Sequence, residues 1–201
     1  IPYSGDVPKA APCVFEYIYF CRPDSLLGGR LAYLSRVAMG KQLAKEHPIS
    51  ADMVIGVPDS ATAASVGYSQ ESGIPYSDGL IKNRYVGRTF IQPEQRFRDL
   101  GVRMKFNPLP EVIAGKRIII VDDSIVRGTT TPQVVDMVRR AGASEVHMRV
   151  CAPPIIYPCH FGIDLATRGE LLAANMSLEE IRKFIGADTL GYLSLNGLLK
   201  S

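Results

Sequence analysis

The sequence predicts an α/β fold, with a mostly parallel, twisted sheet flanked by helices. Strand-like and helix-like segments alternate along most of the chain, an order that produces parallel strands joined by crossover helices. Residues 118–121 are all apolar, which is typical of a parallel strand covered on both faces. The length of 201 residues suits one hydrophobic core, so we expect a single domain over residues 1–201.

The first half of the chain contains two predicted strand and helix pairs. Aromatic and β-branched residues predict a strand at residues 13–20. Apolar residues at three- and four-residue spacing predict an amphipathic helix within residues 25–47, stopped by Pro48. A short apolar strand at residues 52–58 then runs into a small-residue turn that opens a second helix.

The second half begins with a strand-like piece near residues 74–81 and a loop over residues 82–107. A loop of this length in a compact domain is usually functional or mobile. Farther along, a stripe of valines ended by Gly142 predicts a helix, and residues 145–153 predict the next strand. A Ser-x-x-Glu capping-box pattern at residues 177–180 predicts the start of another helix.

The composition is that of a soluble protein and excludes a membrane span. Apolar residues make up 46% and charged residues 21% of the chain, as in ordinary globular domains. No stretch stays apolar for the roughly 18 residues that a membrane helix needs. The first residues show no initiator Met and no secretory signal. We therefore expect a fragment of a longer protein in the cytoplasm or, if the source is a plant, in an organelle stroma.

Positive charge is concentrated in the predicted loop. From Lys82 to Lys105, seven residues are basic and two are acidic, a local net charge of +5 against +3 for the whole chain. Such a segment can be a solvated basic loop, a nucleic-acid patch or a lid over an anionic ligand. Its length, its Gly and Pro residues and a phosphate-binding pattern later in the chain favour the lid, and we expect no nucleic-acid partner.

The stretch "IIIVDDSIVRGTTT", from Ile118 to Thr131, carries the main functional signal. Asp122 and Asp123 follow the apolar strand, and ligands of parallel sheets bind at this end of the strands. The next turn opens a helix whose N–H groups and dipole favour an anion, and the threonine hydroxyls add donors. The pattern predicts a phosphate cradle. The alternative is that the carboxylates merely cap the helix.

Two carboxylates beside a phosphate site would repel the bare anion, so another group must lie between them. Sugar hydroxyls donate hydrogen bonds to carboxylates and Mg²⁺ takes hard oxygen ligands, and both fit. The chain has neither G-x-x-x-x-G-K-[ST] nor G-x-G-x-x-G after a strand. This argues against a nucleoside triphosphatase and against a Rossmann dehydrogenase.

The motif "IVDDSIVRGTT" at residues 120–130 resembles the signature of the type I phosphoribosyltransferases, which share a Rossmann-like fold and bind phosphoribosyl pyrophosphate (PRPP). Together with "FEYIYFCRPDS", "GVPDSATAAS" and "GLIKNRYVGRTFIQPEQRFR", the chain is similar over almost its whole length to the glutamine PRPP amidotransferases. The resemblance implies a glycosyltransferase of purine synthesis. That Mg²⁺-dependent family makes 5-phosphoribosylamine and pyrophosphate from PRPP and ammonia, which glutamine supplies.

The resemblance also implies roles for single residues. Asp122 and Asp123 would hold the ribose hydroxyls and, with Ser60, the Mg²⁺ ion. The turn of Asp59 and Ser60, where a non-proline cis peptide is common in this fold, would meet pyrophosphate. Residues 127–131 would wrap the 5-phosphate. The implied PRPP-binding set is completed by Ser124, Arg127, Gly128, Thr129, Thr130 and Thr131.

The predicted lid would supply the remaining site residues. By resemblance, Lys82, Arg84 and Arg88 would meet the pyrophosphate, and Tyr85 would help to order the closed site. The physical reasoning agrees, because cations stabilise the charge that builds on a leaving pyrophosphate. Closure would also exclude water from a reactive sugar carbon.

Of the four cysteines, two match a cofactor position. Some amidotransferases of this family carry a [4Fe–4S] cluster, and Cys13 and Cys159 fall on two of its ligand positions. The other two family ligands lie beyond this chain, so the set is partial. Cys21 and Cys151 do not match ligand positions and are expected to be small buried residues.

The resemblance implies a glutaminase domain before residue 1 and a homo-oligomer. Two rival functions are weighed against it. A salvage phosphoribosyltransferase would need a base-reading region, and none is evident. A regulator that senses PRPP without catalysis could dispense with the basic residues of the lid, which this chain retains.

Overall fold

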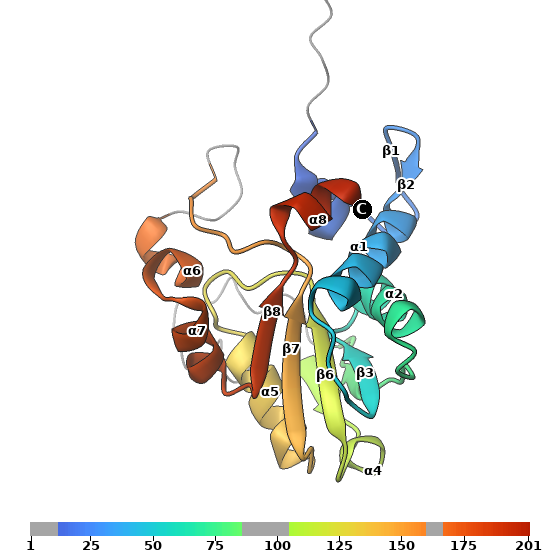
Figure 1. The fold of residues 1–201 in the computed structure, drawn as a ribbon, viewed down its shortest axis with the longest axis vertical. Helices are drawn as coiled ribbons and strands as arrows, with labels where there is room; N and C mark the ends of the chain where they lie inside the picture. Colours follow the sequence, from blue (N-terminus) through green and yellow to red (C-terminus); the bar gives the residue numbers. More distant parts are fainter. Residues whose placement is uncertain (1–11, 86–104, 160–166) are drawn as a thin grey trace, which may run out of the picture.

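The computed structural model describes residues 12–85, 105–159 and 167–201 (Figure 1). These residues form a parallel four-stranded sheet with the strand order β3-β6-β7-β8. Its strands are β3 (Met53–Gly56), β6 (Arg117–Asp122), β7 (Glu145–Val150) and β8 (Thr189–Tyr192). A parallel bridge between Val54 and Tyr76 lies outside the named strands. The predicted α/β class and mostly parallel sheet are confirmed.

Strand β6 lies inside the sheet because it is apolar on both faces. The side chains of residues 118–121 have no exposed surface, and β3 and β7 pair with the strand on either side. Burial on all sides holds the strand in one position. Asp122, the last residue of β6, and Asp123, which follows it, are therefore placed by the core of the protein.

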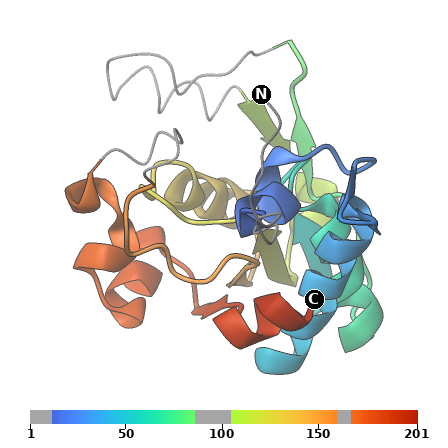
Figure 2. The same ribbon diagram turned by 90° about the horizontal axis from the view of Figure 1, so that it is seen from above.

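Helices cover both faces of the sheet, as Figure 2 shows from above. One face carries α1 (Ala32–Glu46) and α2 (Thr62–Ser72), and the other carries α5 (Thr131–Arg140) and α7 (Leu178–Ile185). The close packing of α1 and α2 requires glycine at the contact. A Cβ atom on Gly40 would lie only 1.8 Å from the Ala64 carbonyl oxygen.

The shorter helices complete the second half of the chain. They are α4 (Pro110–Ile113), η3 (Arg168–Glu170), α6 (Leu172–Asn175) and α8 (Leu195–Lys200). The predicted capping box of α7 is confirmed, since the Ser177 hydroxyl accepts from the Glu180 N–H and the Glu180 carboxylate accepts from the Ser177 N–H. In the described part of the chain, no helix is both long and apolar enough to cross a membrane.

The predicted strand at residues 13–20 is wrong. These residues form helical turns that include the π-helix η1 (Glu16–Phe20). Strand propensity depends on packing against a neighbouring strand, and here the surroundings favour a helical backbone. The buried Arg36 guanidinium donates hydrogen bonds to the carbonyls of Tyr17 and Cys21, at 2.9 and 2.7 Å. Tertiary contacts thus fix this segment.

The first helix also starts later than predicted. Strands β1 (Leu26–Leu27) and β2 (Arg30–Leu31) form a hairpin in front of α1. Gly28 and Gly29 connect them with φ values of 55° and 82°. Positive φ at both central residues is what a tight two-residue turn requires, so the Gly-Gly pair is the hairpin signal in the sequence.

The predicted loop at residues 82–107 is bounded by an antiparallel ribbon. Strand β4 (Leu80–Lys82) pairs with β5 (Phe106–Pro108), so the two ends of this segment are strand rather than loop. Strand β4 covers only the end of the strand-like piece predicted near residues 74–81. Residues 86–104, which include Arg88 and most of the predicted lid, lie outside the described residues.

Candidate active site

Asp122 and Asp123 lie at the carboxyl end of β6 and are almost fully buried, with 7% and 8% of their surface exposed. The Asp123 N–H donates to Asp122 Oδ1 at 2.9 Å, and the Ser124 hydroxyl donates to Asp123 Oδ1 at 2.5 Å. Backbone hydrogen bonds from Cys151 and Ala152, beyond β7, hold both aspartate carbonyls. The carboxylate pair is therefore preorganised by the sheet.

The pair occupies an electrostatically unfavourable environment. Burial raises the pKa of both carboxyls, and repulsion from Asp123 raises the pKa of Asp122 further. Four neighbours partly offset this rise in the pKa of Asp123. Ser124 and Ser60 lower it through hydrogen bonds, and Arg36 and Lys105 lower it through their positive charges. A cation or a set of hydroxyl donors bound here would relieve the repulsion.

The turn after the carboxylates opens helix α5. Thr130 is its N-cap residue, yet no side chain caps the helix, so the first N–H groups are not occupied by a cap. Gly128 has a φ of 68°, and Val126 O accepts a hydrogen bond from the Leu172 N–H. Arg127 donates to Glu170 Oε2 at 3.2 Å. The turn is therefore held from outside, and the uncapped start of α5 suits a phosphate.

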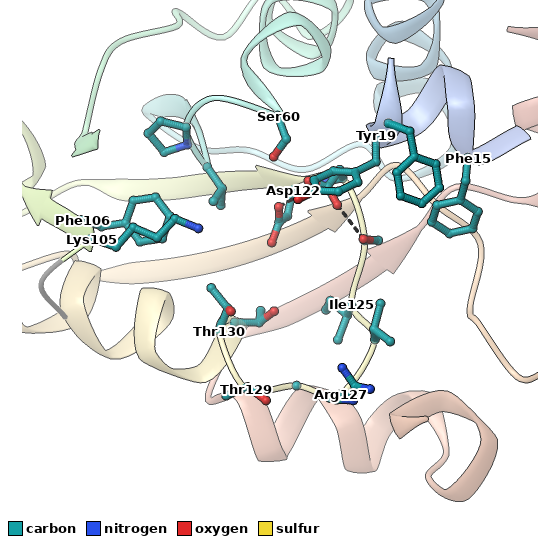
Figure 3. Close-up of a pocket in the computed structure, with 18 residues that line it drawn as sticks. Phe15, Tyr19, Ser60, Lys105, Phe106, Asp122, Ile125, Arg127, Thr129 and Thr130 are labelled. Atoms are coloured by element: carbon teal, nitrogen blue, oxygen red, sulfur yellow. Dashed lines mark hydrogen bonds between the residues drawn. The ribbon is translucent and has the colours of Figure 1, made fainter. Parts of the chain in front are cut away.

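A cavity of about 340 Å³ joins these elements (Figure 3). Its lining includes the predicted residues Ser60, Asp122, Asp123, Ser124, Arg127, Gly128, Thr129, Thr130 and Thr131. Thr131 has only 3% of its surface exposed, so its hydroxyl contributes less to the cavity than its neighbours do. The carboxylate pair and the phosphate-type turn therefore face one shared space.

The turn of Asp59 and Ser60 closes another side of the cavity. The peptide bond between Pro58 and Asp59 is cis, as the resemblance predicts for this turn. Ser60 faces the cavity, whereas the Asp59 carboxylate is exposed and accepts a hydrogen bond from Lys82 Nζ at 2.6 Å. The structure thus joins the first lid residue to the turn beside the carboxylates.

The other predicted lid residues that the structure describes do not line the cavity. Arg84 is exposed and Tyr85 is fully exposed, and neither lines the cavity. Arg88 is among the residues outside the described part of the chain. Of the three predicted catalytic side chains that the structure describes, Lys82 alone contacts an element of the site.

The lining residues that were not predicted from the sequence include Phe15, Tyr19, Phe20 and Lys105. Tyr19 and Phe20 lie in η1, and Phe15 is its N-cap residue. Arg36 of α1 holds this segment, and the wrong strand assignment concealed these residues. Lys105 was counted within the basic segment but was given no role.

The two carboxylates of the cavity fit a magnesium ion that is also bound by substrate and water, and not a metal site made of protein ligands alone. Mg²⁺ is usually bound by one or two carboxylates together with substrate oxygens and water, and Asp122 and Asp123 offer that arrangement. Among the described residues, no three His, Cys, Asp or Glu side chains gather around one point that could hold a metal. Cys13 is exposed and Cys159 partly buried, and two thiolates cannot complete a [4Fe–4S] site.

Comparison with known proteins decides the family. A family model described as the phosphoribosyl transferase domain matches residues 37–153, which include β3, β6, the carboxylate pair and the phosphate-type turn. The chain belongs to the phosphoribosyl transferase family. The predicted type I phosphoribosyltransferase fold is confirmed by solved structures as well.

Phosphoribosyl transferases with similar sequences carry a more specific name. The chain is 57% identical over 204 aligned residues to the amidophosphoribosyltransferase of Methanocaldococcus jannaschii, covering 100% of this chain and 43% of that protein. With the enzyme of Synechocystis, identity is 58% over 187 residues, covering 93% of this chain and 38% of that protein. These relatives confirm the resemblance to the amidotransferases. The chain spans less than half the length of each.

A solved phosphoribosyl transferase structure agrees with the sequence comparison. Glutamine PRPP amidotransferase from B. subtilis, complexed with ADP and GMP, superposes with a TM-score of 0.85 at 56% identity. The match covers 94% of this chain and 41% of that one. The fold is therefore shared over nearly the whole chain.

Proposed function

We propose that the protein transfers ammonia to PRPP, giving 5-phosphoribosylamine and pyrophosphate, as the phosphoribosyltransferase half of a glutamine-dependent amidotransferase. The observation that carries this proposal is one cavity in which a buried carboxylate pair faces a turn that opens a helix. The names of the relatives support the choice of ammonia as the acceptor.

In this proposal, the ribose 5-phosphate half of PRPP binds to the preorganised side of the cavity. Asp122 and Asp123 accept hydrogen bonds from the ribose hydroxyls, and the turn at residues 127–131 donates to the 5-phosphate. Ser124, which bonds to Asp123, fixes the orientation of that carboxylate. Both groups lie on the shared cavity wall, so one ligand reaches both.

Magnesium would be held by Asp122 and Asp123, with Ser60 beside them, and would supply charge neutralisation for the pyrophosphate. Burial of the two carboxylates supports this assignment, because their mutual repulsion favours a bound cation.

The pyrophosphate half would meet the turn of Asp59 and Ser60 and the basic residues Lys82, Arg84 and Arg88. The lone pair of ammonia forms a bond to the anomeric carbon while the bond to pyrophosphate breaks and its electrons leave with the pyrophosphate oxygen. The ammonium group formed then loses one proton to solvent. Cations around the leaving group stabilise the charge that it gains, and Tyr85 would help to cover the site.

The remaining proposals concern the longer protein. Because the chain spans less than half the length of its relatives, we propose that a separate glutaminase domain supplies the ammonia. We also propose a homo-oligomer and a cytoplasmic location. Residues 1–201 would form one domain with a lid over about residues 82–107. Cys13 and Cys159 would be two of four cluster ligands, and iron and sulfide analysis of the full-length protein tests this.

The direct test measures pyrophosphate release from PRPP with ammonium chloride and Mg²⁺. We expect turnover that depends on ammonia, and Asp123→Ala should lower kcat at least about a hundredfold, since it removes one of the two buried carboxylates. PRPP binding without turnover would favour a sensor instead, and turnover only with a purine or pyrimidine base would favour a salvage enzyme. An unchanged rate in Asp123→Ala would refute the carboxylate assignment.

A further inference from the structure

Lys105 lines the cavity although it lies at the far end of the basic segment in the sequence. Its backbone carbonyl accepts a hydrogen bond from the Asn83 N–H at 2.8 Å, which ties it to the residue after β4. Its side chain is partly buried, and Nζ lies 5.2 Å from the centroid of the Phe106 ring. The backbone of Lys105 is therefore tied to the end of β4, and its ammonium group lies over the neighbouring ring.

The charges around Lys105 come mainly from the site itself. Burial and repulsion from Lys82 lower the pKa of Lys105, whereas attraction from Asp122, Asp123 and Asp59 acts to raise it. Lysine is rarely buried unless it is paired, yet Lys105 forms no ion pair with another described residue. A partly buried ammonium that has no ion-pair partner among the described residues, and that lies beside a proposed phosphate site, has the chemistry of an anion-binding group.

The position of Lys105 indicates which part of the ligand it would meet. In Figure 3, Lys105 and Arg127 lie on opposite sides of the Asp122 carboxylate. The turn that contains Arg127 is the cradle for the 5-phosphate, so Lys105 faces the other end of the ligand. On that side it is close to the charges of Lys82 and Asp59, an ion pair that joins β4 to the turn proposed for pyrophosphate.

We propose that Lys105 is a further substrate-contacting residue that binds the pyrophosphate group of PRPP and stabilises its negative charge as it leaves. The inference rests on the proposed function and adds a residue to it. Lys82 and Lys105 differ in their starting state. Lys82 must leave the Asp59 carboxylate to reach a phosphate, whereas Lys105 already faces the cavity.

The experiment compares three probes in the full-length protein with Mg²⁺: PRPP, inorganic pyrophosphate and ribose 5-phosphate. Lys105→Met should weaken binding of PRPP and pyrophosphate by at least about tenfold, because a charge-assisted contact is lost. Binding of ribose 5-phosphate should stay within about twofold, since that ligand lacks the pyrophosphate. Lys105→Arg should retain much of the affinity, as it keeps the charge.

Lys116→Met is the matched control, because Lys116 precedes β6 at the end of the sheet away from the cavity. It should bind all three probes like the wild type. If the wild type binds PRPP and Lys105→Met binds it equally well, the role of Lys105 is refuted while the proposed function stands. If Lys105→Met weakened the binding of ribose 5-phosphate as much as the binding of PRPP, the proposed role would also be refuted. The lysine would then affect the whole site and not the pyrophosphate group alone. A wild type that binds none of the probes would refute both.

Discussion

The paired strands β3 and β6 have aspartates near both ends of the sheet, and the surroundings of these aspartates differ. Asp52 directly precedes β3 at the amino end, and Asp122 and Asp123 lie at the carboxyl end of β6. At the amino end, the Asp52 carboxylate accepts hydrogen bonds from the N–H, Nε and Nη2 groups of Arg117 at 2.8, 3.2 and 2.9 Å. These bonds lower the pKa of Asp52 to about 2. At the carboxyl end, burial raises the pKa of Asp122 and Asp123.

The difference separates a stabilising end of the sheet from a binding end. Asp52 has its partner within the protein, so its charge favours the folded state at neutral pH. The carboxylate pair has too few donors and lies beside a cavity, so its charges oppose folding until a ligand supplies a cation and hydroxyls. Proteins commonly accept this cost at sites that bind and react.

The largest effect should come from Asp122→Asn. The amide keeps the shape of the side chain and can still accept the Asp123 N–H, but it removes one of the two charges. We expect ammonia-dependent pyrophosphate release to slow by about a hundredfold or more. The Tm of the unliganded protein should rise, because repulsion within the pair is removed. Kinetic assays and thermal unfolding measure the two effects.

The rise in Tm for Asp122→Asn should depend on pH. A carboxyl with a raised folded pKa binds its proton more tightly when folded, so the wild type loses stability as pH rises above the ordinary carboxyl pKa of about 3.9. The advantage of the variant should therefore be largest at neutral pH and shrink as pH falls toward about 4. A lower Tm than wild type at neutral pH would contradict the contrast between the two ends.

A smaller effect is expected from the glycines that flank β6. Gly128 and Gly115 have φ values of 68° and 74°, a conformation that costs other residues about 1–2 kcal/mol. A Cβ atom on Gly128 would lie 2.9 Å from Phe184 and 3.0 Å from Leu172, whereas one on Gly115 meets nothing within 4 Å. Gly128→Ala should shift the phosphate turn and weaken ribose 5-phosphate binding about tenfold.

Gly115→Ala is the control for this prediction. It should lower the Tm through backbone strain alone and leave the affinity for ribose 5-phosphate unchanged, because Gly115 lies at the amino end of β6. Isothermal titration with both variants makes the comparison. Equal affinities for Gly128→Ala and the wild type would show that the turn does not need its glycine to bind phosphate.

The sequence predicts those parts of the structure that depend on residues close together in the chain. The apolar run of β6 identifies a buried parallel strand, and two aspartates directly after it must lie at the carboxyl end. The capping box of Ser177 and Glu180 is equally local, since both partners lie within one helical turn. In each case, neighbours in the sequence decide the structure.

The parts that escaped prediction depend on contacts across the fold. Aromatic residues at positions 13–20 have strand propensity, but the distant Arg36 holds their carbonyls in helical turns. No pattern in α1 shows that this arginine, unlike its charged neighbours, is buried. Lys105 enters the cavity only because β5 pairs with β4, and that pairing cannot be read from a segment without clear periodicity.

The smallest effect should come from Asp52→Asn, at the stabilising end. An exposed ion pair contributes little, so the Tm at neutral pH should fall by about 1–3 °C while activity stays unchanged. The lowered pKa means that Asp52 stabilises the fold above the ordinary carboxyl pKa of about 3.9, and that this contribution is lost as pH falls toward about 2. The Tm difference between variant and wild type should thus shrink in acid, whereas Asp122→Asn changes Tm in the opposite direction at neutral pH. A loss of activity in Asp52→Asn with an unchanged Tm would mean that both ends of the sheet serve the reaction, and the division between them would fail.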